Sequence, residues 1–320
     1  MSKIGKIIPK PIKNSILWIV RRPEKISNKI YQAAAKGKIP FPDKAFQKWD
    51  YKVHTGRKLN IKTPKTYQEK LQWLKYYYRN PEYTRMVDKY AVREYVKEKI
   101  GDEYLVPLFG VYDSFEEIDF DKLPNQFVLK CTHDQGSVCI CKDKKTFDYE
   151  KTKTILNKAL ATKHFYLSRE WYYKNVKPRI LCEKLLEQNS QEDGLIDYKF
   201  LCFNGVPKVL YVYSGRNTNN PCVDYRDIEW NRLPIRHGHY NNSLEDIPKP
   251  ENYKLMIELA EKLSYNIPFV RIDFYESAGR VYFGEMTFFP SGGRILLQPE
   301  KYNYVFGQQI GLPVKMRVNK

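Results

Sequence analysis

The sequence predicts an α+β protein, and three observations lead to that prediction. Of its 320 residues, 42% are hydrophobic and 15% aromatic, which is too apolar for a disordered chain and enough for a large core. Stretches with helical spacing of apolar residues occur separately from stretches in which apolar and polar residues alternate. Short turns join several of the alternating stretches, so antiparallel strand pairing is expected to dominate.

The first hundred residues of the chain are predicted to be mainly helical. Residues 1–50 are basic and contain five prolines, so short helical pieces are expected there. A regular helix is predicted to begin at Thr63-Pro64, and Asn80-Pro81 ends it. A second helix is predicted from Val87 to Ile100, with Gly101 as its C-terminal cap.

Strands dominate the prediction after Gly101. The six segments predicted as strands are 105–113, 125–133, 138–143, 179–187, 197–205 and 207–215. A helix over residues 147–168 separates the first three from the last three, and Asn204-Gly205 is predicted to form the turn between the last two. A strongly amphipathic helix over 251–265 leads into a final hairpin.

The final hairpin carries charged residues where an apolar interior is expected. Its two strands lie within residues 269–285 and are joined by a turn over 276–279. Arg271, Asp273 and Glu285 each have apolar or aromatic neighbours on both sides. Since an unpaired buried charge costs several kcal/mol, we expect either a bound cation and an anionic substrate, or a buried ion pair, to compensate these charges.

Other segments contain residue types suited to a nucleotide. Lys130 ends a strand and precedes a polar loop, 131–137, whose backbone N–H groups would suit a polyphosphate, although an ordinary β-turn fits as well. Glu183 lies where a strand leads into a connection, a place suited to binding adenine and ribose. Asp197 and Lys199 are expected on one face of a strand, either at a site or as an ion pair.

Oxygen ligands point to a hard cation in the hairpin. Asp273 and Glu285 are candidates for Mg²⁺, which favours carboxylates shared with substrate phosphates. Arg271, two residues before Asp273, could stabilise developing negative charge. Ser291-Gly292-Gly293 offers backbone N–H groups to another anion. A zinc site is not expected, and the scattered histidines form no convincing Ser–His–Asp triad.

The charge balance favours anionic partners. The 55 Lys and Arg exceed the 37 Asp and Glu by 18, which suits nucleic acid, acidic lipid or acidic sugars, but also a solvated basic surface. The six cysteines are interpreted as buried free thiols in a reducing compartment. Residues 16–20 are the longest apolar run near the N-terminus, too short for a membrane span. We therefore expect a cytoplasmic protein whose N-terminal segment either contacts the inner face of the membrane or packs on the body.

The order of these pieces resembles the TupA-like family of ATP-grasp ligases. The segments that carry the resemblance are TPKTYQEKLQWLK, DKYAVREYV, LPNQFVLKCTH, SREWYYKNVKPRILCEKLLE, DYKFLCFNG and RIDFY, spread over residues 45–300. The resemblance implies an ATP-grasp fold in which two α+β subdomains hold a nucleotide between them. It implies a basic segment at 1–50, then a catalytic domain at 51–320 with a lid over 101–185 and a second subdomain over 186–300.

The resemblance also implies ligand sets for ATP and Mg²⁺. The residues implied to bind the nucleotide are Lys89, Lys130, His133, Gly136, Ser137, Glu183, Lys184, Leu185, Leu186 and Glu187. Among them, Lys89 and Lys130 would contact phosphates, Glu183 to Leu186 would form the adenine hinge, and Glu187 would bind ribose. Those implied for catalysis and metal binding are Arg271 and Lys199, and Asp273, Glu285 and Thr287. Thr287 stands where the superfamily usually has Asn, and the phosphate loop has fewer glycines than usual.

The function implied is an ATP-dependent carboxylate–amine ligase of capsular or other cell-surface polysaccharide synthesis. Its partners would be an acidic sugar or polysaccharide precursor and an amine, either an amino acid or an amino sugar. Trp230 and the arginines Arg216, Arg232 and Arg236 would line the acceptor site. The alternatives are a sugar kinase, a glycosyltransferase-associated enzyme, or a non-catalytic basic module that binds glycan or nucleic acid. No nucleic-acid-binding motif is present, so a nucleic-acid partner is not expected.

Overall fold

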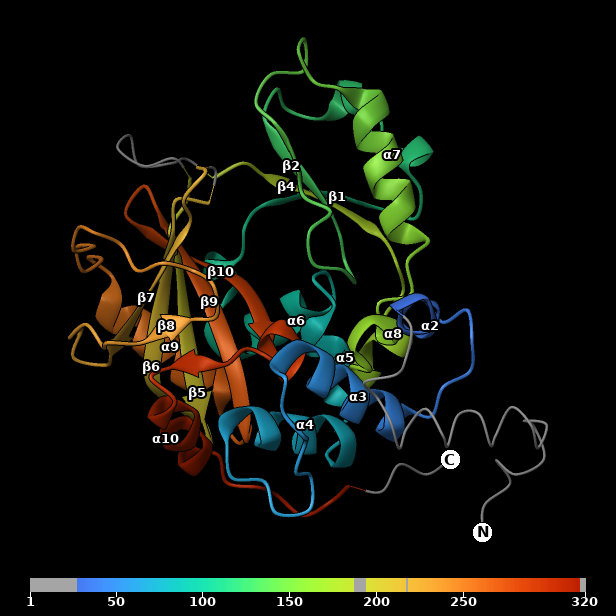
Figure 1. The fold of residues 1–320 in the computed structure, drawn as a ribbon. Helices are drawn as coiled ribbons and strands as arrows, with labels where there is room; N and C mark the ends of the chain where they lie inside the picture. Colours follow the sequence, from blue (N-terminus) through green and yellow to red (C-terminus); the bar gives the residue numbers. More distant parts are fainter. Residues whose placement is uncertain (1–27, 187–193, 217, 317–320) are drawn as a thin grey trace.

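Two antiparallel sheets and a layer of helices make up the fold seen in a computed structural model, which describes residues 28–186, 194–216 and 218–316 (Figure 1). A four-stranded sheet with one long helix forms the small lobe, at the top of Figure 1. A five-stranded sheet with its own helix forms the large lobe, and the N-terminal helices lie beside both. The α+β prediction is confirmed.

The small lobe contains the sheet β1-β4-β2-β3, in which every neighbouring pair is antiparallel. Its elements are β1 (Leu108–Tyr112), β2 (Phe127–Cys131), β3 (Cys139–Cys141), α7 (Tyr149–Leu160) and β4 (Ile180–Lys184), with short 3-10 turns η3 (Asp102–Tyr104), η4 (Phe115–Glu117) and η5 (Phe120–Lys122). Alternation along β2 buries Phe127 and Leu129 in a core with Leu156 of α7. Val128 and Lys130 therefore lie on the opposite face of the sheet.

The large lobe contains the sheet β10-β9-β5-β6-β7, also antiparallel throughout. Its elements are β5 (Asp197–Phe203), β6 (Val206–Ser214), β7 (Cys222–Asp227), β8 (Arg236–His237), α9 (Tyr253–Ser264), β9 (Phe269–Ser277), β10 (Arg280–Thr287), η7 (Pro290–Gly293), β11 (Leu297–Gln298) and α10 (Lys301–Gln309). Helix α9 covers one face of the sheet, where Phe200 stacks against Tyr253 and meets Phe274 edge-on. Part of the other face holds the site, and the rest belongs to the core, because Phe203 and Phe269 pack there against Tyr67.

The helical layer connects the lobes. Its elements are α2 (Asn28–Ala35), α3 (Asp43–Thr55), α4 (Tyr67–Tyr77), α5 (Glu82–Val87), α6 (Val92–Ile100), α8 (Phe165–Ser168) and η6 (Trp171–Lys174). The Arg169 guanidinium lies 4.0 Å from the centre of the Phe46 ring and joins the α8 segment to α3. Helix α3 runs through the boundary predicted at residue 50, because it begins only after Pro42. Residues 1–27 lie outside the described chain.

Most predicted elements are present, but several bounds are wrong. The helix predicted to begin at Thr63-Pro64 is α4. Thr66, and not Thr63, caps it through a capping box with Glu69. The next predicted helix begins at Val92, because the Asp88 side chain accepts hydrogen bonds from the N–H groups of residues 90 and 91; Gly101 caps it as predicted.

Other corrections concern the second half of the chain. The helix predicted over 147–168 ends at Leu160, where the His133 ring contacts the Ala159 carbonyl, and only a short turn, α8, follows. The strand β7 was not predicted. The final hairpin turns on two residues, Ala278 and Gly279, both with positive φ, and not on four.

A single extra residue in β10 decides which way Glu285 faces. Phe283 pairs with Phe274, and Glu285 pairs with Asp273, so Gly284 between them has no partner in the ladder. Without this bulge, alternation would place Glu285 on the α9 face with Phe283. A Cβ at Gly284 would lie 2.9 Å from the Tyr275 ring and 3.1 Å from the Asp273 carbonyl oxygen, so the bulge needs glycine.

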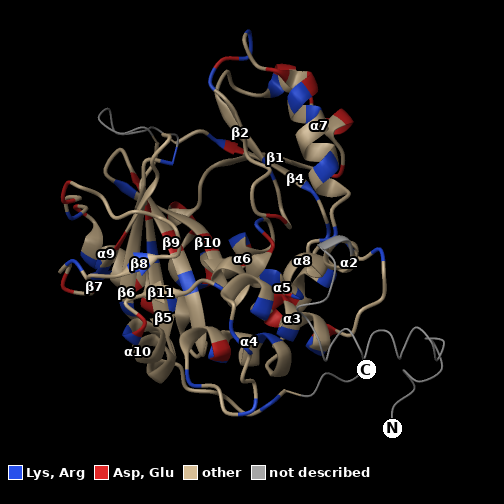
Figure 2. Cartoon of the chain, viewed as in Figure 1, with Lys and Arg blue, Asp and Glu red and all other residues tan. Residues whose placement is uncertain are grey.

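Charged residues are spread over both lobes and the helical layer in the view of Figure 2. In the part of the chain that the structure describes, no helix is both long enough and apolar enough to cross a membrane.

Gly284→Ala is expected to lower the free energy of unfolding by about 1–3 kcal/mol, because the new methyl group has no space beside Asp273 and Tyr275. Urea unfolding measures the change. Arg280→Ala, at an exposed position of the same strand, should change it by less than about 0.5 kcal/mol. Equal stabilities of the two variants would contradict the close approach at Gly284.

Candidate active site

A cavity of about 420 Å³ lies between the two lobes, within the size range of sites for small molecules. The small lobe lines it with residues of β2, β3 and β4, and the large lobe with residues of β5, β9 and β10. The part lined by Val106, Val128, Val138, Ile140, Leu185, Leu186 and Leu195 is apolar. The rest is lined mainly by charged side chains of both signs, so the cavity suits a molecule with an apolar part and a charged part.

Strand register places the polar residues of the large lobe in one row. Reading across β7, β6, β5, β9 and β10, the residues paired in turn are Tyr225, Tyr211, Lys199, Asp273 and Glu285. Directly paired residues of antiparallel strands share a face of the sheet. The row therefore lies on the face turned away from α9.

An alternating series of charges, which we call the ionic chain, runs along this face. In order its members are Arg216, Asp197, Lys199, Asp273, Arg271 and Glu285. Lys199 Nζ lies 3.0 Å from Asp197 Oδ1 and also contacts Asp273. Arg271 Nε donates to Asp273 Oδ1 at 2.6 Å. Each buried charge thus has an opposite charge on either side, which offsets the cost of removing it from water.

The two ends of the ionic chain are its more exposed members. Arg216 pairs with buried Asp197, and 47% of its side chain is exposed. Glu285 accepts a hydrogen bond from Arg271 at 2.5 Å, and 34% of its side chain is exposed. Both line the cavity. The chain therefore presents a cation at one end and a carboxylate at the other to whatever the cavity holds.

Two members of the ionic chain, Glu285 and Lys199, are held in their charged forms, whereas burial raises the pKa of the Asp273 carboxyl. Burial would raise the pKa of the Glu285 carboxyl, but Arg271, Lys199 and Lys89 outweigh burial and lower that pKa to about 2. Burial would lower the pKa of Lys199, but the neighbouring Asp273 carboxylate raises it above the ordinary lysine value. Glu285 is therefore a carboxylate, and Lys199 an ammonium, at neutral pH.

Lys130 from the small lobe and Lys89 from the segment between α5 and α6 also line the cavity. Lys130 contacts the Glu183 carboxylate, which also lies 3.3 Å from Arg93 Nη1. Lys89 Nζ donates to the carbonyl of Asp134, and its own N–H donates to the Thr132 carbonyl at 3.1 Å. The loop predicted to bind phosphate is thus tied to the start of α6. Arg93 was missed, since its helical position gave no signal in the sequence.

Two side chains predicted to bind the nucleotide are turned away from the cavity. His133 is buried, and its Nε2 lies 3.1 Å from the Ala159 carbonyl oxygen and 3.2 Å from that of Thr162. Ser137 Oγ donates to Asp134 Oδ1 at 2.7 Å and accepts from the Cys131 N–H. Both side chains fix the shape of the loop and neither lines the cavity, so their role as ligands stays a prediction. Gly136 of the same loop lines the cavity.

The predicted hinge is only partly available to a base and a ribose. Lys184, Leu185 and Leu186 line the cavity as predicted, although the Lys184 N–H donates to the Pro107 carbonyl. Glu183, the first residue of the predicted hinge, also lines the cavity, and its carboxylate contacts Lys130 and lies 3.3 Å from Arg93 Nη1. Glu187, predicted to bind ribose, lies outside the described residues.

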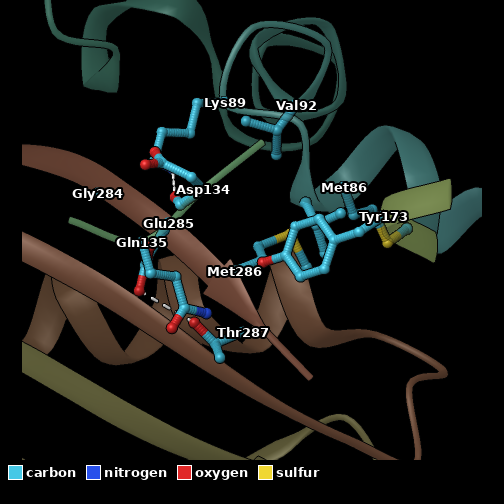
Figure 3. Close-up of a pocket in the computed structure, with 11 residues that line it drawn as sticks. Met86, Lys89, Val92, Asp134, Gln135, Tyr173, Gly284, Glu285, Met286 and Thr287 are labelled. Carbon is cyan, nitrogen blue, oxygen red and sulfur yellow. Dashed lines mark hydrogen bonds between the residues drawn. The ribbon is translucent and has the colours of Figure 1, made fainter. Parts of the chain in front are cut away.

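The three predicted metal ligands lie together. Asp273 and Glu285 are directly paired across strands, and Thr287 Oγ1 donates to Glu285 Oε1 at 3.1 Å (Figure 3). All their donor atoms are oxygens, as Mg²⁺ prefers, and three protein ligands would leave positions for phosphate oxygens and water. Residues 28–186, 194–216 and 218–316 contain no cluster of three or more His, Cys, Asp or Glu suited to a metal. The set fits Mg²⁺ better than zinc.

A small pocket of about 10 Å³, the size of one water molecule, adjoins the metal-ligand candidates. Figure 3 shows Lys89, Glu285 and Thr287 around it, with Met86 and Tyr173 closing another side. The small pocket shares Lys89 and Glu285 with the large cavity. The polar groups of both lobes therefore meet at this point.

The predicted acceptor region is mostly committed to the fold. The Trp230 ring packs 4.9 Å from Tyr253 of α9, on the opposite face of the sheet from the cavity. Arg232 donates to Asp224 at 2.5 Å and to the Ser243 carbonyl. Arg236 Nε lies 3.4 Å from the Tyr240 carbonyl oxygen. Of the four residues predicted for the acceptor, only Arg216 lines the cavity.

The sequence matches the family described as TupA-like ATPgrasp over residues 69–311. No curated protein matches it. Among solved structures, a D-alanine–D-alanine ligase from Bacillus anthracis complexed with ATP is 14% identical, with a TM-score of 0.36 over 63% of this chain and 53% of that chain. A RimK domain ATP-grasp protein from Sphaerobacter thermophilus is 11% identical, with a TM-score of 0.40 over 73% and 70%. The ATP-grasp ligase PsnB with its minimal precursor is 9% identical, with a TM-score of 0.36 over 66% and 55%.

The chain spans only 53% to 61% of the length of the D-alanine–D-alanine ligases it is similar to. The family match covers about three quarters of the chain. This match, and not the similarity to solved structures, supports the assignment to a family.

Lys199→Met is expected to lower the free energy of unfolding by about 3–5 kcal/mol, because it leaves Asp197 and Asp273 without their shared cation. Chemical denaturation at neutral pH measures the change. Lys184→Met removes an exposed lysine from the same cavity and should cost less than about 0.5 kcal/mol. If Lys199→Met is no less stable than Lys184→Met, the ionic chain does not stabilise the fold.

Proposed function

The chain belongs to the TupA-like ATPgrasp family, and from this premise we propose that it is an ATP-dependent ligase that joins a carboxylate to an amine. The observation that carries the proposal is the ionic chain, which faces a cavity of about 420 Å³ between two lobes. A non-catalytic binding module has no evident use for a guanidinium, a lysine and two carboxylates buried on one face of a sheet.

The nucleotide is proposed to bind with its base at the apolar end of the cavity. Val128 of β2 and Leu186, just after β4, would supply apolar contacts, and Lys184 to Leu186 would form the hinge. Lys89 and Lys130 would contact the phosphates. Lys89 already donates to the Asp134 carbonyl, in the loop that contains Gly136, and Lys130 already contacts the Glu183 carboxylate. Lys199 would lie on the γ-phosphate side.

The charge of the lining supports a metal requirement. The cavity is lined by five cations and five anions: Lys89, Lys130, Lys184, Lys199 and Arg216, and Asp134, Glu183, Asp197, Asp273 and Glu285. Their charges cancel, so the lining alone does not neutralise a triphosphate. Mg²⁺ held by Asp273, Glu285 and Thr287 would offset the charge on the transferring phosphoryl group when bound.

The proposed chemistry depends on positioning and electrostatics. A substrate carboxylate attacks the γ-phosphorus of ATP, and the acyl phosphate and ADP form. An amine then attacks the acyl carbon and displaces inorganic phosphate, which leaves an amide. Lys199 and Arg271 would donate to the oxygens on which negative charge develops. In the structure both side chains contact Asp273, on the same face of the sheet.

The proposed substrates are an acidic sugar, such as a hexuronic acid of a capsular or other cell-surface polysaccharide, and an amino acid or amino sugar. The half-exposed Arg216 supports an anionic substrate, because its guanidinium is fixed by Asp197 on one side while its side chain reaches the cavity. The excess of 18 positive charges agrees with acidic partners. Contact of the basic N-terminal segment, residues 1–50, with a membrane, as against packing on the body of the protein, stays a prediction.

Binding of Mg²⁺·ATP is expected to raise the unfolding temperature by several degrees, since a ligand at a hundredfold excess over its dissociation constant adds about 2.7 kcal/mol. Lys130→Met should abolish the shift. Lys153→Met, which removes a surface lysine paired with Glu116 in the same lobe, should retain it. Thermal unfolding with and without Mg²⁺·ATP measures the shift. A full shift in Lys130→Met would contradict the proposed contact of Lys130 with the phosphates.

The reaction class is tested by incubating the protein with Mg²⁺·ATP, a hexuronic acid and a set of amines. ADP release is expected to require both acid and amine, and the product mass should equal their sum less one water. A phosphorylated sugar formed without any amine would show a kinase instead. Arg216→Ala should raise the KM for the acid at least tenfold, or about 1.4 kcal/mol, with the KM for ATP unchanged.

A further inference from the structure

The Arg271 guanidinium lies between the two carboxylates proposed to hold the metal. Its Nε donates to Asp273 Oδ1 at 2.6 Å, and its Nη2 donates to Asp273 Oδ2 at 2.7 Å. The same Nη2 donates to Glu285 Oε1 at 2.5 Å. A cation of the protein thus already bridges the oxygens that a divalent ion would use.

The bridge is held from several sides. Tyr211 OH accepts from Arg271 Nη1 at 3.0 Å, and Arg271 is directly paired with Thr287 across the strands. Lys199 contacts Asp273 and Asp197, whereas Arg271 contacts both Asp273 and Glu285. Both oxygens of Asp273 and one oxygen of Glu285 therefore accept hydrogen bonds from Arg271. Direct coordination of Asp273 to a metal requires these hydrogen bonds to break.

We propose that Arg271 takes the place of the divalent cation when neither metal nor nucleotide is bound, and that the two ligands displace it together. This inference rests on the proposed metal and nucleotide site. A guanidinium between two carboxylates removes their mutual repulsion, so the hairpin stays folded without metal. A triphosphate offers Arg271 another anion, and the released carboxylates can then coordinate the metal. Metal and nucleotide affinities are then coupled, each raising the other.

The first test titrates Mn²⁺ alone into the nucleotide-free protein, with free Mn²⁺ followed by electron paramagnetic resonance. Arg271→Met should bind Mn²⁺ at least tenfold more tightly than the wild type. Arg216→Met is the matched control, because it removes one positive charge from the opposite end of the ionic chain without touching Glu285. It should change the affinity less than threefold. The inference is overturned if both variants show the same increase in Mn²⁺ affinity, or if Arg271→Met shows no increase.

A second variant covers the case in which Arg271→Met does not fold. Tyr211→Phe removes only the hydroxyl that holds Arg271 Nη1 and leaves every charge in place. It should bind Mn²⁺ alone about threefold to tenfold more tightly than the wild type. If it is folded by thermal unfolding and its Mn²⁺ affinity matches that of the wild type, the guanidinium does not compete with the metal.

The same titration with a non-hydrolysable ATP analogue separates this inference from the proposed function. The wild type should bind Mn²⁺ at least tenfold more tightly with the analogue than without it, and Arg271→Met should show a smaller difference. If neither protein binds Mn²⁺ even with the analogue, the proposed metal site is wrong and this inference falls with it. Another outcome is that the analogue raises the Mn²⁺ affinity of the wild type while Arg271→Met, without the analogue, binds Mn²⁺ no more tightly than the wild type does. In that case only the displacement of Arg271 by the metal is wrong.

Discussion

Buried charge on the inner face of the five-stranded sheet is the constraint around which the large lobe is built. Asp197, Lys199 and Asp273 are all buried, and each would destabilise the fold by several kcal/mol if left alone. Strand register sets them in reach of one another, while the residues between them, such as Phe200, face α9. One face of these strands thus packs on α9, and the other carries the site beside further core residues such as Phe203.

The helical layer extends this dependence toward the N-terminus. Gln72 of α4 donates to the carbonyls of Gly292 and Gly293 at 2.8 and 2.9 Å, and buried Lys75 also donates to Gly292. Gln47 of α3 in turn donates to Gln72. These contacts fix the segment that follows β10. Helix α3 lies before residue 69, where the family match begins. Through Gln47 it nevertheless contacts the residues that hold the segment after β10.

The sequence was most informative where local pattern and chemistry agree. Asp273 and Glu285 could be singled out because a carboxylate among apolar neighbours is unusual, and the strands could be found because alternation is local. The direction of His133 could not be predicted, because it depends on where α7 ends. Arg216 could not be told apart from Arg232, because only the packing decides that Asp224 holds Arg232 away from the cavity. Such facts depend on contacts between distant segments, which a single sequence does not display.

The bulge at Gly284 also bears on how relatives of this protein diverge. Phe283 and Glu285, on either side of Gly284, pair with the consecutive residues Phe274 and Asp273. A relative that lacks the bulged residue would keep this pairing, because regular alternation would then place its acid opposite Asp273, on the face away from Phe283. A relative that keeps the residue but draws it into the ladder would instead set its acid opposite Ile272, on the side of α9. A one-residue gap at this point in a sequence comparison is therefore no sign of lost chemistry.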